Sequence, residues 1–182
     1  VFRWIVALVN VLSHPTLKAQ TPKEFPLVSI LIPTRNEGHN LPHLFNQLSK
    51  LRHPLLEIIA LNDHSEDDTE ALLKAYSQHN SNFRYVNGKA LPKGWLGKNW
   101  ACHQLGMIAK GEYFLFLDAD VAFLDEGLLP RSLAEMSRHN LSLLSIFPDQ
   151  IMKSRGERLV VPLMHYLLLS LLPLWWILRL PL

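Results

Sequence analysis

The sequence predicts an α/β fold, in which a mostly parallel β-sheet is flanked by helices and the chain ends are apolar helices associated with a membrane. Two observations predict it. Short apolar runs alternate with segments whose apolar residues recur at helical spacing, which is typical of a parallel sheet covered on both faces. Both ends of the chain are almost continuously apolar, whereas the middle carries most of the charges.

The first strand, helix and second strand follow from the apolar pattern. Residues 28–32 (VSILI) form a short run typical of a buried parallel strand, which Pro33 is expected to end. Leucines at helical spacing over 41–51 predict a helix, and residues 55–61 (LLEIIAL) a second buried strand.

The remaining elements follow in the same alternation. Ser65 and Asp68 fit a capping box that would start a helix continuing through Tyr76. The further elements expected are a strand over 83–86, a helix over 98–109, a strand over 113–117, a helix over 129–137 and a strand over 141–147.

Both ends of the chain predict contact with a membrane. Residues 1–12 contain only Arg3 and Asn10 as polar groups and are shorter than the about 20 residues that span a bilayer, so they would end an anchor helix. Residues 159–178 carry no formal charge and reach that length, and with two prolines they either span the bilayer or lie in its interface. The alternatives are that the first segment is a helix packed on the domain and that the second is a buried core helix of a larger protein.

Length and composition limit the possible functions. The chain has 182 residues, the size of one domain, and begins with valine rather than methionine, which indicates a fragment or a processed product. Lysine plus arginine number 18 and aspartate plus glutamate 16, so the net charge of only +2 gives no electrostatic footprint for nucleic acid, and we expect no nucleic-acid partner. A single cysteine, Cys102, excludes a disulfide framework and a multi-cysteine zinc site.

Polar residues follow three predicted strands at the point where each strand ends. They are residues 34–37, residues 63–68, and Asp118 with Asp120. The carboxyl ends of parallel strands meet at one edge of a sheet, and α/β proteins bind ligands there. The sequence therefore predicts one ligand site built from these three loops.

Acidic residues are the first candidates within this site. Asp118 and Asp120, two residues apart where a strand ends, can both reach one Mg²⁺ or Mn²⁺ ion that neutralises a diphosphate leaving group; the alternative is a helix cap and a solvated acid. Asp63 can accept a hydrogen bond from the ring N–H of a nucleobase, or it can form an Asx turn.

Two further loops add candidates. Thr34 can present its hydroxyl and backbone to a nucleoside, and Glu37 can pair with Arg35 or reach a ribose; the alternative is a polar loop at a helix start. In GWLGKNW, Lys98 stands at a helix N-terminus, where the helix dipole disfavours a cation. A bound phosphate would resolve that conflict, and the alternative is a solvated lysine.

Four motifs in the order VSILIPTRNE, ALNDHSEDDT, GWLGKNWAC and FLFLDAD resemble the family 2 glycosyltransferases of the GT-A fold. The GWLGK stretch followed by an apolar segment most resembles the membrane-associated branch that acts in hopanoid and carotenoid pathways. The resemblance implies an inverting transfer of sugar from a nucleotide-sugar donor, most often a UDP-sugar, to a lipid or isoprenoid-like acceptor, assisted by Mn²⁺ or Mg²⁺. We expect a membrane-associated protein whose catalytic domain is cytoplasmic, because nucleotide-sugars are available there.

Individual residues match the motifs of that family. Asp63 matches the acid that contacts uracil, Lys98 a basic position near the diphosphate, Asp120 the metal-binding acid, and Asp118 its partner facing the ribose or the metal. The strand-one nucleotide motif is matched by Pro33, Thr34, Asn36 and Glu37.

The resemblance also bears on what this chain contains. The general base of the family follows the Asp-x-Asp motif at a distance, and we expect it beyond Leu182. The expected organisation is an anchor helix end over 1–20, a GT-A nucleotide-sugar-binding domain over 25–150 and an apolar membrane-associated segment over 151–182. The alternatives are a non-catalytic fragment that binds nucleotide and membrane, and a related nucleotidyltransferase.

Overall fold

The computed structural model describes residues 2–12, 17, 22, 24–122, 125–146, 148–171 and 174. The chain divides into two compact units, one of residues 19–144 and one of residues 1–18 with 145–182. Parts of the anchor expected over 1–20 and of the apolar segment expected over 151–182 lie outside the described residues.

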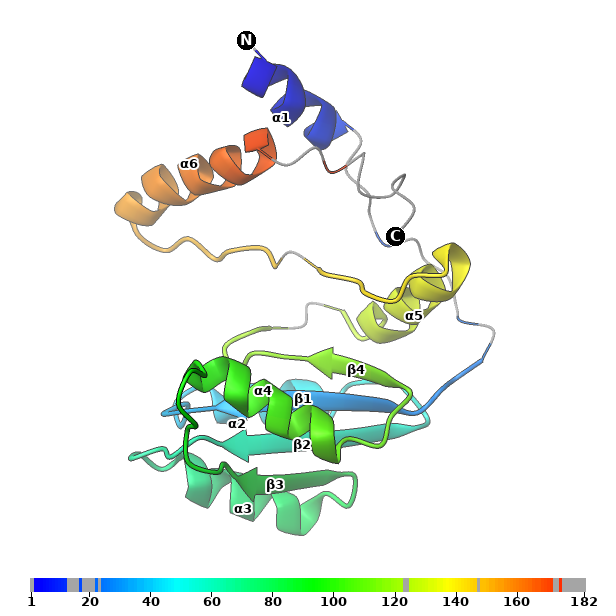
Figure 1. The fold of residues 1–182 in the computed structure, drawn as a ribbon, viewed down its shortest axis with the longest axis vertical. Coiled ribbons are helices and arrows are strands. Elements are labelled where there is room, and N and C mark those ends of the chain that lie inside the picture. Colours follow the sequence, from blue (N-terminus) through cyan, green and yellow to red (C-terminus); the bar gives the residue numbers. More distant parts are fainter. Residues whose placement is uncertain are drawn as a thin grey trace. The chain divides into compact units, whose positions relative to one another are not determined.

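The larger unit is built on a parallel four-stranded sheet, which confirms the predicted α/β class (Figure 1). The strand order is β3-β2-β1-β4, so the chain runs outward from β1 to β3 and then returns to the other side of β1. The strand order therefore reverses between β1 and β4, and such a switch point is where α/β proteins bind ligands. The strands are β1 (Val28–Thr34), β2 (Leu56–Asn62), β3 (Phe83–Asn87) and β4 (Tyr113–Phe116).

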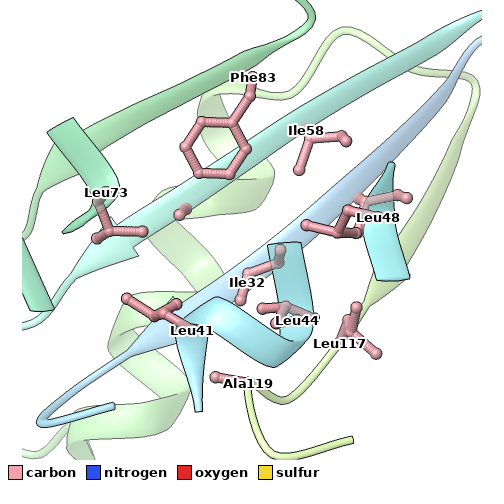
Figure 2. Close-up of a cluster of buried hydrophobic side chains, with 11 residues drawn as sticks. Ile32, Leu41, Leu44, Leu48, Ile58, Leu73, Phe83, Leu117 and Ala119 are labelled. Atoms are coloured by element: carbon pink, nitrogen blue, oxygen red, sulfur yellow. The ribbon is translucent and has the colours of Figure 1, made fainter. Parts of the chain in front are cut away.

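Helices cover both faces of this sheet. On one face, α2 (Leu41–Leu48) and α3 (Thr69–His79) enclose the main apolar cluster, which Figure 2 shows. On the opposite face, α4 (Gly97–Ile108) packs Ala101 and Leu105 onto β1 and β2. Burial on both faces explains why β1 and β2 read as continuous apolar runs.

Helix α5 (Leu128–His139) ends the larger unit. Leu129 and Leu133 pack on Val28 at the start of β1. Asn140 adopts the left-handed conformation (φ 50°), and the Leu141 N–H donates to the Met136 carbonyl at 2.9 Å, which closes the helix end.

A hydrogen-bonded carboxylate ties the strands together at the edge opposite their carboxyl ends. Glu57 accepts from the Ser29 hydroxyl at 2.6 Å and from the Lys110 N–H at 2.9 Å, and Arg84 lies 3.2 Å away. Burial raises the pKa of Glu57, but the hydrogen bonds from Ser29, Lys110 and Arg84 outweigh it, so its pKa lies below the ordinary value of 4.5.

The smaller unit pairs the two apolar segments. Helix α1 (Phe2–Leu12) packs on α6 (Arg155–Leu171). A capping box starts α6, because Ser154 Oγ accepts the Glu157 N–H at 3.1 Å while the Glu157 carboxylate accepts the Ser154 N–H at 2.8 Å. Among the described residues, no helix combines the length and the apolar character needed to cross a bilayer.

Three local predictions are wrong. Residues 141–146 form no strand, because none of the strands in the described part of the chain pairs with them; Phe147 lies outside the described residues. Ser65 caps no helix: its N–H donates to Asn62 Oδ1 at 3.1 Å, and α3 starts at Thr69. Pro33 lies inside β1 rather than ending it.

The position of Pro33 has a geometric reason. The Leu31 carbonyl accepts the Leu117 N–H on the β4 side, and the Thr34 carbonyl accepts the Asp63 N–H on the β2 side. Pro33 therefore faces the β4 side, beyond the last paired residue of β4, so its missing N–H costs no ladder hydrogen bond.

Candidate functional site

The predicted site residues gather at the carboxyl ends of the strands. The loops after β1, β2 and β4 and the N-terminus of α4 all lie at this edge of the sheet (Figure 1). The switch point between β1 and β4 lies at the same edge. The fold thus brings together segments that are far apart in the sequence.

The loop after β1 is fastened to the loop after β2. Thr34 is buried and its hydroxyl donates to the Leu61 carbonyl at 2.9 Å, so this hydroxyl is engaged within the protein, and its presentation to a nucleoside stays a prediction. Asn36 has a φ of 55°, and its N–H donates to Ser65 Oγ at 3.0 Å while its Oδ1 accepts the Glu66 N–H at 2.8 Å. Through these hydrogen bonds, Thr34 and Asn36 fix the position of the loop after β1 relative to β2 and the loop that follows it.

Glu37 and Gly38 extend this connection to the start of α3. The Glu37 N–H donates to Thr69 Oγ1 at 2.8 Å, and the Gly38 N–H donates to Asp67 Oδ2 at 3.0 Å. A Cβ atom on Gly38 would lie 1.8 Å from Asp68 Oδ1, so any larger residue here would have to displace the Asp68 carboxylate. A hydrogen bond from the Thr69 hydroxyl lowers the pKa of Asp67. Glu37 does not pair with Arg35, whose guanidinium faces Asp63 instead.

Asp63 lies at the N-terminus of α4. Its side chain is only 15% exposed, with Arg35 Nη1 3.8 Å from Oδ2 and His64 Nδ1 3.2 Å from Oδ1. A Cβ atom on Gly97, the first residue of α4, would lie 3.6 Å from Asp63 Oδ2. The backbone at Gly97 therefore comes close to this carboxylate, and the positive end of the helix dipole favours an anion there.

Lys98 pairs with Asp118. Lys98 Nζ lies 2.7 Å from Asp118 Oδ1 and 2.8 Å from Oδ2, so the carboxylate offsets the lysine charge that the helix dipole disfavours. The hydrogen bond that Lys98 donates to Asp118 raises the pKa of Lys98, and burial opposes it only in part. The pair connects the N-terminus of α4 to the end of β4.

Asp120 completes the acidic end of β4. Ala119 is buried in the main apolar cluster, so the flanking carboxylates of Asp118 and Asp120 turn away from the core. The charge of Asp120 also contributes to the raised pKa of Lys98. Among the described residues, no group of three or more histidine, cysteine, aspartate or glutamate side chains could hold a metal. Two carboxylates fit an ion whose other ligands are water and phosphate oxygens, as is common for Mg²⁺ and Mn²⁺.

Aromatic side chains line the neighbouring surface of α4. The rings of Trp95 and Trp100 lie 5.1 Å apart, and His103 lies 5.0 Å from Trp95 and 5.4 Å from Trp100. A shallow groove beside them reaches Lys98 and the exposed ring of Phe116. His103 and Phe116 were not predicted from the sequence as part of this surface. The available signal for His103 is its position one helical turn after Asn99, and for Phe116 its position two residues before Asp118.

The fold is that of an α/β protein whose charged side chains gather at the edge of the sheet that contains the switch point, the place where such folds bind ligands. The model of glycosyl transferase family 2 matches residues 29–174. The chain therefore belongs to glycosyl transferase family 2, and the resemblance predicted from its motifs is confirmed.

Curated relatives are similar over most of this chain. A 4,4'-diaponeurosporenoate glycosyltransferase of Staphylococcus haemolyticus is 29% identical over 133 residues, which are 72% of this chain and 34% of the relative. The enzyme of the same name from Staphylococcus aureus strain MRSA252 is 31% identical over 75% of this chain and 36% of its own length. The chain thus spans about a third of the length of the curated relatives it matches.

Solved structures share the fold. A mannosyltransferase from Pyrobaculum calidifontis, in complex with GDP-Man and Mn²⁺, superposes with a TM-score of 0.60 at 19% identity, covering 74% of this chain and 41% of that one. Residues 1–349 of TarS from Staphylococcus aureus give a TM-score of 0.52 at 22% identity, covering 70% and 39%. Their similarity supports the GT-A fold of the larger unit.

Proposed function

We propose that this chain is the donor-binding part of an inverting glycosyltransferase that transfers a sugar from a nucleotide-sugar to a lipid-like acceptor. The observation that carries the proposal is the convergence of Asp63, Lys98 and Asp118 at the switch point of the sheet. They come from the end of β2, the start of α4 and the end of β4. A nucleotide-sugar has matching parts, a base that offers N–H groups and a diphosphate that needs cations.

The base and ribose would lie between the first two loops and α4. Asp63 is held by its neighbours with its carboxylate beside Gly97, so it can accept a hydrogen bond from the ring N–H of uracil. Because Thr34 and Asn36 use their polar groups to hold these loops, we assign them, with Pro33, the shaping of the nucleoside site rather than side-chain contact. UDP is the nucleotide we propose.

The diphosphate would lie between Lys98 and the acidic end of β4. Asp118 and Asp120 would hold Mn²⁺ or Mg²⁺, which supplies a positive charge that stabilises the departing diphosphate. In the structure Lys98 neutralises the Asp118 carboxylate. Because a bound metal would neutralise that carboxylate instead, Lys98 would then leave Asp118 and pair with a diphosphate oxygen. Its position at the helix N-terminus places it among backbone N–H groups suited to phosphate.

The acceptor and location are proposed from the relatives and the apolar segments. The relatives are named as glycosyltransferases of 4,4'-diaponeurosporenoate, which supports a carotenoid-like acceptor for this chain. The apolar helices α1 and α6 support association with a membrane. We place the donor-binding unit in the cytoplasm, where nucleotide-sugars are available.

Calorimetric titration of UDP into the detergent-solubilised chain, with and without Mn²⁺, tests the donor site. We expect binding that depends on the metal and that Asp120→Asn abolishes, because the amide replaces a charged ligand. Asp149→Asn makes the same chemical change at an exposed position in the other unit and should leave binding unchanged. Unaltered UDP binding in folded Asp120→Asn protein would refute the assignment.

A further inference from the structure

Helices α1 and α6 expose most of their large apolar side chains. On α1, Phe2 and Trp4 are 77% and 68% exposed, and on α6, Leu159 and Leu171 are 78% and 60% exposed. Soluble surfaces seldom carry so many large apolar side chains next to one another, and such a surface marks a contact with a membrane or another protein.

The two helices are nevertheless joined in a specific way. The rings of Trp4 and Tyr166 lie 5.0 Å apart (α1 and α6 lie side by side in Figure 1). Asn10 is buried, its Nδ2 donates to the Leu169 carbonyl at 2.6 Å, and its Oδ1 accepts the Leu174 N–H at 2.9 Å. The amide side chain of Asn10 on α1 thus donates one hydrogen bond to, and accepts one from, the backbone of residues 169 and 174.

Those two bonds satisfy backbone groups that a helix cannot. The Leu169 carbonyl would normally accept from the residue four positions on, but that residue is a proline and has no N–H. On the same stretch of chain, Leu174 gives its N–H to Asn10 Oδ1. In water such groups can bond to solvent, whereas in lipid they must be satisfied inside the protein. Asn10 therefore satisfies, from within the protein, the backbone groups that lipid cannot satisfy.

The charges point to the kind of surface. Arg155 and Arg158 are exposed in the first turn of α6, and residues 159–171 carry no formal charge. The acid among them, Glu157, is engaged by the Ser154 and Lys153 N–H groups. A basic start followed by an apolar stretch complements anionic headgroups above hydrocarbon.

We infer that α1 and α6 form one unit that docks on a membrane containing anionic lipids, with Asn10 as the residue that holds the unit together. The inference rests on the membrane contact in the proposed function and does not depend on the donor site.

Flotation of the full chain with vesicles tests this unit. We expect flotation with vesicles of phosphatidylcholine and phosphatidylglycerol, and weaker flotation with phosphatidylcholine alone. Arg155→Gln and Arg158→Gln should each weaken binding to the anionic vesicles about fivefold. Equal flotation with both vesicles, unaffected by these variants, would overturn the role of anionic lipids.

Asn10→Leu separates one paired unit from two independent apolar helices. If the helices bound separately, the added apolar surface would strengthen flotation. For a paired unit we expect flotation to weaken about fivefold or more, because two backbone groups lose their partner. Asn46→Leu makes the same change at an exposed position on α2 and should have no effect.

The alternative occupant is a second copy of the chain. Self-association in detergent that Asn10→Leu leaves unchanged, together with no flotation, would overturn the inference. UDP binding measured on the same samples reports the donor site separately, so failure of one proposal is distinguishable from failure of the other.

Discussion

Replacing Lys98 with methionine tests the ion pair at the centre of the site. Nζ lies 2.7 and 2.8 Å from the two Asp118 oxygens, so a cation that binds this carboxylate has to displace the ammonium group. The side chains are 64% and 48% exposed, and an exposed pair contributes about 0–1 kcal/mol to stability. That contribution lowers the apparent metal affinity by up to a factor of about five.

Two titrations measure the effect. Mn²⁺ titrated into the nucleotide-free chain, followed by electron paramagnetic resonance, should bind Lys98→Met up to about five times more tightly than the original chain. UDP titrated in the presence of saturating Mn²⁺ should bind Lys98→Met more weakly, because the diphosphate loses a cation. Lys93→Met removes an exposed lysine from the loop that precedes α4 and should change neither titration.

The opposite signs of the two changes are what the reasoning requires. If Lys98→Met left both affinities unchanged, the pair would be a surface contact unrelated to the ligand. If it weakened Mn²⁺ binding without nucleotide, Lys98 would support the metal site instead of competing for it, and the proposed exchange would be refuted.

Three further predictions concern stability and access. Glu57→Gln should destabilise the chain at neutral pH, because the lowered pKa of Glu57 means that its ionised carboxylate stabilises the fold. The difference in free energy of unfolding between the variant and the original chain should shrink as the pH falls below 4.5, the ordinary pKa, and Glu57 becomes protonated. Denaturation at several pH values measures this difference. Thr34→Val should cost about 1 kcal/mol of unfolding free energy through the lost bond to Leu61, and a fall in UDP affinity larger than that loss explains would support a ligand role for the hydroxyl. Gly97→Ala should leave thermal stability intact, since the new Cβ makes an ordinary contact 3.6 Å from Asp63, but should weaken UDP binding by narrowing access to that carboxylate.

The central strands of the sheet could be predicted because each produces a pattern within a few consecutive residues of the sequence. Strands β1 and β2 are buried on both faces, so each is a continuous apolar run that stands out in the sequence. Their parallel arrangement then places Asp63 and Asp118 at one edge without further information. The motif order was specific enough to predict the family.

What failed depended on partners distant in the sequence or on local competition. Asn62 takes the Ser65 N–H, so the apparent capping box does not form. The pair of Lys98 and Asp118 requires α4 and β4 to be placed beside each other, which no local pattern records. Asn10 looked like an interruption of an apolar segment, because its partners lie more than 150 positions away.

The strand order also has a consequence for how the chain folds. Val28 pairs with Leu56, which is nearby in the sequence, but on its other side it pairs with Tyr113, about three times as far along the chain. Closing a loop three times as long costs about 1 kcal/mol more entropy. We therefore expect β1 and β2 to associate early and β4 to join late. The half of the edge that carries Asp63 would exist in folding intermediates before the half that carries Asp118, so competence to bind nucleotide and competence to bind metal would be acquired at different moments.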